Sequence, residues 1–433
     1  MSPDVIGLVG VVFALAFIFL GTEIAVSMVL VGMVGVSVIV GSTVGFERLA
    51  PTIMAQIGSY DLAVLPLFIL MGQLMFVAGS GGRMYRVARL WLGRLPGGLA
   101  IATIMACAIF AAISGSAIAT AATIGAFALP EMRRAGYPMG LASATVAASG
   151  TLGVLIPPSV TFIIYGILVN ESIGELFVAG IVPGLLLALG FALVVMVLEG
   201  RRGAAAIAEN PVPWAEKFRA LLDLAEPLIL LFIVVGGMFG GVFTPNEAGA
   251  IGVLGALVSG LLRRSLTRAR LSEAITETVL ISAVVVFIIA ASSVLSTFLT
   301  VTRIPFTLAD TILASDLPQP AVLALIALGY LVAGMVMEIL PVIIITVPIF
   351  APIIQSMGYD LIWFGVLIVI LGQVGMITPP IGINVFVVGK LLPEVKLSTI
   401  FRSAWWFVGV MLCLVALLIL WKDSIGVMSS WIA

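Results

Sequence analysis

Two apolar stretches of this sequence each carry a Pro-Pro pair, glycines and a few oxygen-bearing side chains. The pairs are Pro157–Pro158 in "SGTLGVLIPPS" (149–159) and Pro379–Pro380 in "GMITPP" (375–380). Proline has no N–H for a helix and its ring clashes with the preceding turn, so each pair ends a helix inside an apolar run. In hydrocarbon, backbone groups freed in this way are tolerated only where they are buried in protein or line a wet cavity. The sequence therefore predicts two broken helices that surround a cavity.

The polar side chains near these breaks all carry oxygen. They are Ser114, Ser116, Ser149 and Thr151 in the first stretch, and Glu338, Gln373, Thr378 and Asn384 in the second. Hard oxygen ligands without imidazole or thiolate suit alkali cations. The N-termini of the half-helices that follow each break offer N–H groups to an anionic substrate. Serine and threonine in membrane helices also hydrogen-bond neighbouring turns, and glycines allow close packing, so a structural role stays open for each of these residues.

The composition restricts the class of protein. Of the 433 residues, 62% are hydrophobic and 9% are charged, which is typical of a polytopic helical protein in a lipid bilayer. The net charge of −1 does not indicate nucleic-acid binding. Because the chain has no histidine, it cannot build a His-ligated zinc site, a Ser-His nucleophile or a His proton relay, and we expect no enzyme. Cys107 and Cys413 make no disulfide framework.

The distribution of charge predicts the topology. Basic residues cluster in a few loops, which the positive-inside rule places in the cytoplasm, with the N-terminus outside. The start of the chain has no Lys or Arg before its apolar run, so we expect a first spanning helix rather than a signal peptide. Run 97–130 has basic flanks on both sides, which predicts a re-entrant hairpin with "SGS" (114–116) at its tip. Run 319–357 has mostly acidic or neutral flanks and predicts a hairpin from the outside that bends near "EILP" (338–341). A single long helix is the alternative for either run.

An internal repeat accounts for the two hairpins. When the sequence is shifted by 222 residues, the segment 129–158 falls on 351–380 without a gap, and glycines and prolines carry most of the identities. We therefore predict an all-α membrane protein made of two inverted-topology repeats, residues 1–200 and 223–433. A cytoplasmic linker, 201–222, joins them. Each repeat has a hairpin (97–130 or 319–357) and a discontinuous helix (139–169 or 361–389), and substrate and ion sites of secondary transporters lie where such breaks meet.

Three segments resemble a known family. "LPGGLAIATIMACAIFAAISGSAIATAATIGAFALPEMRRAGY", "ASGTLGVLIPPSVTFIIYG" and "GMITPPIGINVFVVG" are similar to the large membrane subunit of TRAP (tripartite ATP-independent periplasmic) transporters, and the resemblance covers essentially the whole chain. It implies an elevator-type, sodium-driven importer of an organic acid in the bacterial inner membrane. It also implies two partners, a small four-helix membrane subunit and a periplasmic solute-binding protein.

The resemblance also implies where the ions and the substrate bind. Each sodium site is expected between a hairpin tip and its own broken helix. The implied sodium ligands are Ser114, Gly115, Ser116, Ser149, Gly150, Thr151, Gly153, Glu338, Gly372, Gln373, Gly375 and Thr378. The expected substrate contacts are Ser116, Thr151, Pro157, Pro158, Pro379, Pro380 and Asn384. Many relatives carry an acid at the position of Gln373, so the role of that acid does not transfer to this chain.

Two other functions are compatible with helix breaks in a membrane. A self-sufficient ion-coupled carboxylate carrier of the same superfamily would share the hairpins and would need no partner protein. A passive channel needs no inverted hairpins and usually shows rings of charge or short identical filters. The identity of the organic acid, the number of sodium ions and the oligomeric state are not encoded in any feature recognised above.

Overall fold

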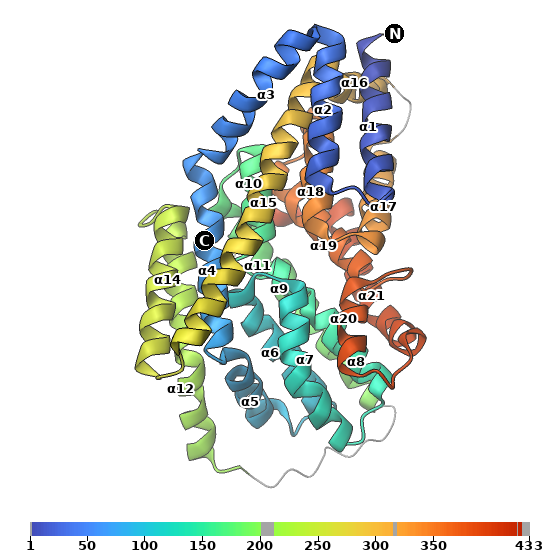
Figure 1. The fold of residues 1–433 in the computed structure, drawn as a ribbon. Helices are drawn as coiled ribbons and strands as arrows, with labels where there is room; N and C mark the ends of the chain where they lie inside the picture. Colours follow the sequence, from blue (N-terminus) through green and yellow to red (C-terminus); the bar gives the residue numbers. More distant parts are fainter. Residues whose placement is uncertain (1, 201–211, 315–317, 422, 427–433) are drawn as a thin grey trace.

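The computed structural model describes residues 2–200, 212–314, 318–421 and 423–426, and its regular structure is helical throughout. The first part of the chain forms α1 (Pro3–Phe19), α2 (Ile24–Val40), α3 (Ser42–Ile57), the short η1 (Tyr60–Ala63), α4 (Val64–Val77), α5 (Ser80–Leu92), α6 (Gly98–Ser114), α7 (Ala117–Arg134), α8 (Met139–Gly150), α9 (Leu152–Leu155), α10 (Val160–Val169) and α11 (Ile173–Gly200). The second part forms α12 (Trp214–Leu231), η2 (Phe232–Gly236), α13 (Gly237–Phe239), α14 (Pro245–Leu262), α15 (Arg268–Thr302), α16 (Ile304–Ala314), α17 (Gln319–Val336), α18 (Ile339–Ser356), α19 (Leu361–Met376), α20 (Ile383–Leu391) and α21 (Leu397–Leu420) (Figure 1). Eight helices of the described residues are long and apolar enough to cross a membrane, or up to nine when a bent pair counts as one span. The predicted all-α membrane fold is confirmed.

Both predicted hairpins are helix–turn–helix units. Helices α6 and α7 pack against each other, and the turn between them holds Gly115 in the left-handed region at φ 58°. Helices α17 and α18 also contact each other and are separated by Met337 and Glu338. The proline of "EILP", Pro341, lies in the first turn of α18, where its missing N–H costs no helical hydrogen bond. A single long helix is therefore wrong for both runs.

Both predicted broken helices are also present. The first consists of α8, α9 and α10, and it bends by 40° between Leu155 and Val160. The second consists of α19 and α20, with Pro379–Pro380 between them. In each case the helix ends just before its proline pair, as the missing N–H groups require.

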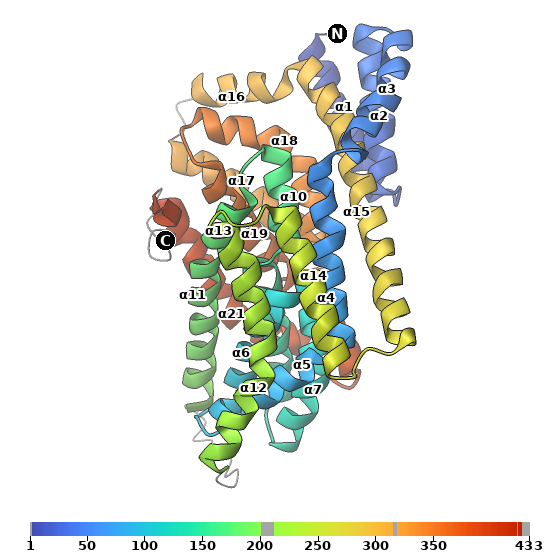
Figure 2. The ribbon, with the colours of Figure 1, turned by 90° about the vertical axis from the view of Figure 1, so that its left-hand side faces the viewer.

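The two parts of the chain correspond element by element at the offset of 222 residues. Helix α7, residues 117–134, maps onto α18, residues 339–356, without any difference in its bounds. Equivalent helices of the two parts make equivalent, reciprocal contacts across the molecule. Helix α10 packs on α18, and the counterparts of this pair, α20 and α7, also pack on each other. In the same way α15 packs on α2, and α14 packs on α4. The two hairpins lie toward opposite ends of the molecule, with α5–α7 in the lower part of Figure 2 and α16–α18 in the upper part. The two parts of the chain are therefore structurally equivalent, and their inverted orientation in the membrane stays a prediction.

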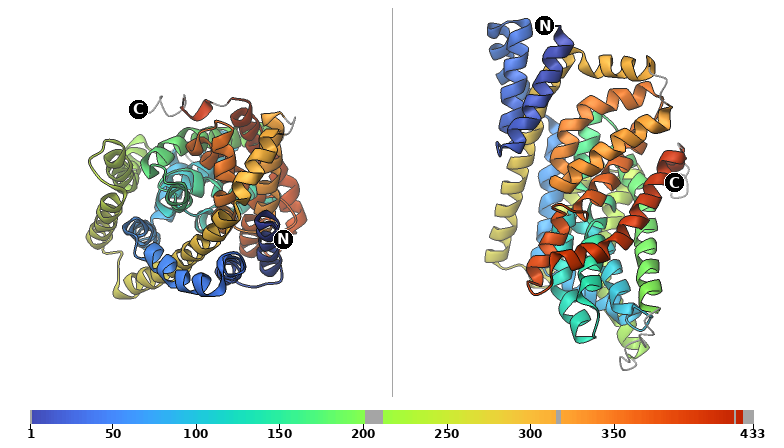
Figure 3. Two further views of the ribbon diagram at one scale, coloured as in Figure 1. Left: turned by 90° about the horizontal axis from the view of Figure 1, so that it is seen from above. Right: turned by 90° about the vertical axis from the view of Figure 1, so that its right-hand side faces the viewer.

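Three helices lie outside the predicted spans and hairpins. Helices α3, α5 and α16 occupy segments where the sequence shows no apolar run long enough to cross a membrane. The two parts of the chain also differ at one place: α15 is continuous over 35 residues, whereas its counterpart is interrupted between α3 and α4 at Gly58–Tyr60. Residues 214–222 of the predicted linker belong to α12, and residues 201–211 lie outside the described part of the chain. Figure 3 shows the long α15 beside the bundle of hairpins and broken helices.

The sidedness of the hairpins is a testable prediction. We expect single cysteines introduced beside Arg94 and Arg134 to resist an impermeant thiol reagent applied from outside, because α6 and α7 pack antiparallel and both flanks are basic. A cysteine beside Asp316 or Asp360, at the flanks of the second hairpin, should be labelled from the same side. Opposite labelling of the two flanks of either hairpin would contradict this topology.

Candidate functional site at the two helix breaks

The tip of the first hairpin lies against the first broken helix. A Cβ atom added at Gly153 would stand 2.5 Å from the carbonyl oxygen of Ser116, and one added at Gly115 would stand 3.1 Å from the carbonyl oxygen of Pro158. A Cβ at Gly150 would come within 2.6 Å of the Cβ of Ala121, one turn further along α7. Glycine is therefore required for the close approach of the helix to the hairpin. The structure brings together the residues that the sequence assigns to the first ion site.

Thr120, which was not among the predicted site residues, makes hydrogen bonds that stabilise this tip. The hydroxyl of Thr120 donates a hydrogen bond to the carbonyl oxygen of Ser116 at 2.7 Å and lies 2.7 Å from the hydroxyl of Ser114. The hydroxyl of Ser116 accepts from the N–H of Ala119 at 3.3 Å and so caps α7. The signal was present in "SGSAIAT", because a threonine four residues after Ser116 lies one helical turn from it.

The first break also receives a side chain from the other part of the chain. The N–H of Thr151 bonds the carbonyl of Ala148, three residues back, and its hydroxyl bonds the same oxygen at 2.6 Å. The carbonyl of Ala147, which Thr151 would use in a regular α-helix, accepts a hydrogen bond from Nδ2 of Asn384 at 3.2 Å. Asn384 lies on α20, directly after the second break. The two breaks therefore meet at one place in the structure.

The second break is closely packed against its own hairpin. A Cβ added at Gly375 would stand 2.6 Å from the Cα of Gly334 in α17, and one added at Gly334 would stand 2.8 Å from the carbonyl oxygen of Gly372. The side chain of Ile339, the first residue of α18, covers the position where a Cβ of Gly372 would lie. The hydroxyl of Thr378 donates to the carbonyl of Val374 at 2.6 Å and stabilises the last turn before the prolines.

Glu338 occupies the turn of the second hairpin, at the position that Ser116 occupies in the first. It is the N-cap residue of α18, but its side chain makes no capping hydrogen bond, in contrast with Ser116. Its carboxyl group is half-buried and has no salt bridge within the described residues. The sequence contains no lysine, arginine or histidine between Arg303 and Lys390. The carboxyl group therefore has no basic side chain nearby in the sequence that could neutralise it.

Three buried polar side chains at the breaks have unpartnered atoms in the part of the chain that the structure describes. These are both side-chain polar atoms of Gln373, Oδ1 of Asn384 and Oγ of Ser149. All three residues are at most 1% exposed. An unpaired polar group in an apolar interior costs about 1–3 kcal/mol, so each of these atoms is a candidate to contact a polar ligand or an ion.

The two proline pairs differ in their exposure. Pro157 and Pro158 are buried, whereas Pro379 and Pro380 are exposed, as is Ile381 after them. The first proline pair is thus covered by protein and the second is open, although Asn384, the other predicted substrate contact of the second half, is buried.

The match to a protein family covers almost the whole chain. Residues 11–423 match the family described as "Tripartite ATP-independent periplasmic transporter, DctM component". The C4-dicarboxylate TRAP transporter large permease protein DctM of Pseudomonas aeruginosa is 36% identical over 76% of this chain and 77% of its own length. The ectoine TRAP transporter large permease protein TeaC of Halomonas elongata is 32% identical over 94% and 95%.

Two further similarities concern length and fold. The isethionate TRAP transporter permease protein DctMQ of Oleidesulfovibrio alaskensis is 34% identical over 87% of this chain, which spans only 59% of that relative. The crystal structure of the YdaH transporter of Alcanivorax borkumensis shares the fold, with a TM-score of 0.59 and 16% identity over 88% of each chain. The resemblance seen in the hairpin and break motifs is thereby confirmed. The chain belongs to the DctM family and is a large membrane subunit of a tripartite ATP-independent periplasmic transporter.

Proposed function

We propose that this chain is the membrane-translocating subunit of a sodium-coupled importer of an organic acid. One observation carries the proposal: each hairpin tip lies against its own broken helix, and the broken helices carry buried polar atoms that have no partner in the described residues, namely Oγ of Ser149, Oδ1 of Asn384 and both side-chain polar atoms of Gln373. The ligands available there are hydroxyl, amide, carboxyl and backbone oxygens, which suit Na⁺. The half-helix N-terminus at α10 supplies N–H groups for a carboxylate.

The reciprocal packing of the two parts supports two inverted repeats and an elevator-type movement. In this mechanism each hairpin moves together with its broken helix, because Gly153 and Gly375 pack them too closely to slide apart. Helices α2, α4, α14 and α15 form the other set of mutual contacts and are suited to remain in place. The buried first proline pair and the exposed second pair support access from one side at a time.

The partners follow from the family. Its systems are tripartite, and we propose that this chain works with a small four-helix membrane subunit and a periplasmic solute-binding protein in the bacterial inner membrane, with its N-terminus outside. The names of the relatives cover C4-dicarboxylate, ectoine and isethionate. The binding protein is therefore proposed to select the individual substrate, and a carboxylate is the class that we favour.

The sodium gradient is large enough for this task. A tenfold inward gradient supplies about 1.4 kcal/mol per ion, and a potential of 100 mV adds about 2.3 kcal/mol per charge. Two ions therefore supply about 7 kcal/mol. The import of a dianion against the same potential costs about 4.6 kcal/mol of this. A third ion would help a dianionic substrate.

Uptake by reconstituted protein tests the proposal. We expect proteoliposomes that contain both membrane subunits to accumulate substrate only with the binding protein and an inward sodium gradient. Liposomes with equal sodium on both sides and liposomes without the binding protein are the controls. Undiminished uptake in sodium-free, proton-buffered medium would contradict sodium coupling, and uptake without the binding protein would favour a self-sufficient carrier.

A further inference from the structure

A polar groove lies between α5 and the first turns of α12, far from the helix breaks. It has a volume of about 780 Å³, and its lining includes Arg86 and Leu90 of α5 together with Glu216, Arg219 and Asp223 of α12. Helices α5 and α12 both lie toward the lower end of the molecule in Figure 1. Neither the transport site nor the hairpins use this groove.

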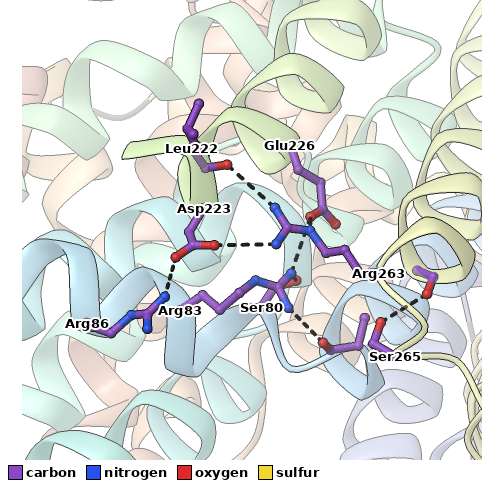
Figure 4. Close-up of polar contacts among 10 residues, drawn as sticks. Ser80, Arg83, Arg86, Leu222, Asp223, Glu226, Arg263 and Ser265 are labelled. Carbon is purple, nitrogen blue, oxygen red and sulfur yellow. Dashed lines mark hydrogen bonds and ion pairs between the residues drawn. The ribbon is translucent and has the colours of Figure 1, made fainter. Parts of the chain in front are cut away.

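The carboxylates beside the groove are already paired. Asp223 forms ion pairs with Arg86 and with Arg263, the latter at 3.3 Å, and Glu226 accepts from Arg263 at 2.5 Å and from Arg83 at 3.4 Å (Figure 4). These contacts join α5, α12 and the end of α14. The network holds the wall of the groove in place and neutralises its two most buried acids.

The groove nevertheless keeps free positive charge. Arg219 has no ion-pair partner in the described residues, and the side chain of Arg86 is 60% exposed and bonds Asp223 through one nitrogen. An arginine has five N–H donors, so Arg86 retains donors for a second anion. The charged residues that line the groove are Arg86, Arg219, Glu216 and Asp223, and Asp223 is already paired with Arg86 and Arg263. The unpaired guanidinium of Arg219 and the remaining donors of Arg86 favour an anionic ligand.

Aromatic side chains mark this level as a membrane interface. Trp91 packs edge-on against Trp214 and Phe218, and Nζ of Lys217 lies 5.2 Å from the centre of the Trp214 ring. Trp214 is 67% exposed and Phe218 is 58% exposed. Tryptophan and nearby cations at the end of an apolar helix are typical of the headgroup region of a bilayer.

An apolar surface continues from the groove along α12. Leu222 lines the groove and is 67% exposed, and Ile229, two turns further along the same face, is 56% exposed. A soluble anion would gain nothing from these side chains, whereas the acyl chain of a lipid would cover them. Basic pockets between helices at the membrane surface bind anionic lipid headgroups in other membrane proteins.

We propose that this groove is a binding site for an anionic phospholipid. Arg86 and Arg219 bind the phosphate of the headgroup, Trp214 lies at the level of the glycerol backbone, and an acyl chain follows Leu222 and Ile229. The site joins α5, which leads into the first hairpin, to α12 and α14, so a bound lipid would stabilise the same end of the molecule as the ion-pair network.

Native mass spectrometry of the full-length chain tests this site. The purified protein is titrated with phosphatidylglycerol or phosphatidylcholine, and the retained lipid is counted for the natural chain and for Arg219→Gln. We expect preferential retention of phosphatidylglycerol and a loss of about fivefold in its affinity in Arg219→Gln, the factor that one cation near an anionic headgroup contributes. Because Arg219 has no partner in the described residues, this variant should keep its melting temperature, and Arg219→Lys should recover most of the affinity.

Arg268→Gln is the matched control, because Arg268 is an exposed arginine at the start of α15, outside the groove. It should leave lipid retention unchanged. Equal retention of the two lipids, or an equal loss in both variants, would overturn the proposal. Displacement of the lipid by millimolar inorganic phosphate would also overturn it and would identify a site for soluble phosphate esters. Loss of affinity confined to Arg219→Gln, with no effect of inorganic phosphate, would support it.

Discussion

Replacing Glu338 by glutamine is expected to weaken sodium-dependent uptake by at least about tenfold in apparent sodium affinity, because a hydrogen-bonded or coordinated charge contributes about 1.5–3 kcal/mol. The carboxyl group lies at the turn of the second hairpin, beside Ile339, which covers Gly372 of the broken helix. Glutamine keeps the shape and removes the charge. Uptake measured against sodium concentration in proteoliposomes gives the affinity directly.

The structure distinguishes a loss of sodium binding from the loss of a helix cap. Glu338 makes no capping hydrogen bond in the structure, so its replacement should leave the melting temperature of the protein unchanged. Ser116→Ala is the matched control, since Ser116 has the equivalent position and does cap α7. That variant should lose about 0.5–2 kcal/mol of helix stability. A Glu338→Gln protein with unchanged sodium affinity would show that the carboxylate has no role in ion binding.

The second large effect is expected from Gly375→Ala. Its new methyl group would stand 2.6 Å from the Cα of Gly334 and equally close to the backbone nitrogen of Met335. Because these are backbone atoms, helix α17 or helix α19 would have to shift. Overpacking of this kind costs about 1–3 kcal/mol in a core, and here it separates the second hairpin from its broken helix. We therefore expect loss of uptake together with a lower melting temperature of the purified protein.

A second glycine in the same hairpin provides the control. Gly329 lies on α17 with no neighbouring atom within 4 Å of an added Cβ. Gly329→Ala should leave uptake intact and raise helix stability slightly, since alanine is better than glycine by about 0.8–1.0 kcal/mol in a helix interior. If Gly375→Ala behaved like Gly329→Ala, close packing of hairpin and broken helix would not be required for transport.

Much of the fold was predictable because glycines and prolines have local consequences. Pro157–Pro158 and Pro379–Pro380 end their helices wherever they occur, and Gly115 is needed for the left-handed turn of the first hairpin. The offset of 222 residues then related the second hairpin, predicted from its own apolar run and flanks, to the first. Helices α3, α5 and α16 were not predicted, because their segments have no long apolar run.

The sequence predicted the residues of the candidate site better than it predicted the contacts between them. Ser116 and Gly153 are brought together as expected, because a hairpin tip and a helix break in one repeat both lack regular hydrogen bonds. The bond from Asn384 to the carbonyl of Ala147 joins residues 237 positions apart, and no local pattern encodes it. Thr120 was missed because a threonine in an apolar helix commonly bonds only its own backbone.

The reciprocal contacts have a consequence for biogenesis. Helix α4 packs on α14, α7 on α20 and α8 on α21, so helices of the first part make extensive contacts with helices that are synthesised later. Until α20 is synthesised, the carbonyl of Ala147 has no Asn384 to accept from. The first hairpin and the first broken helix are therefore inserted in the bilayer before the helices that cover them have been synthesised. Assembly of the transport core is in this sense a late event of translation, completed when the last two membrane helices arrive.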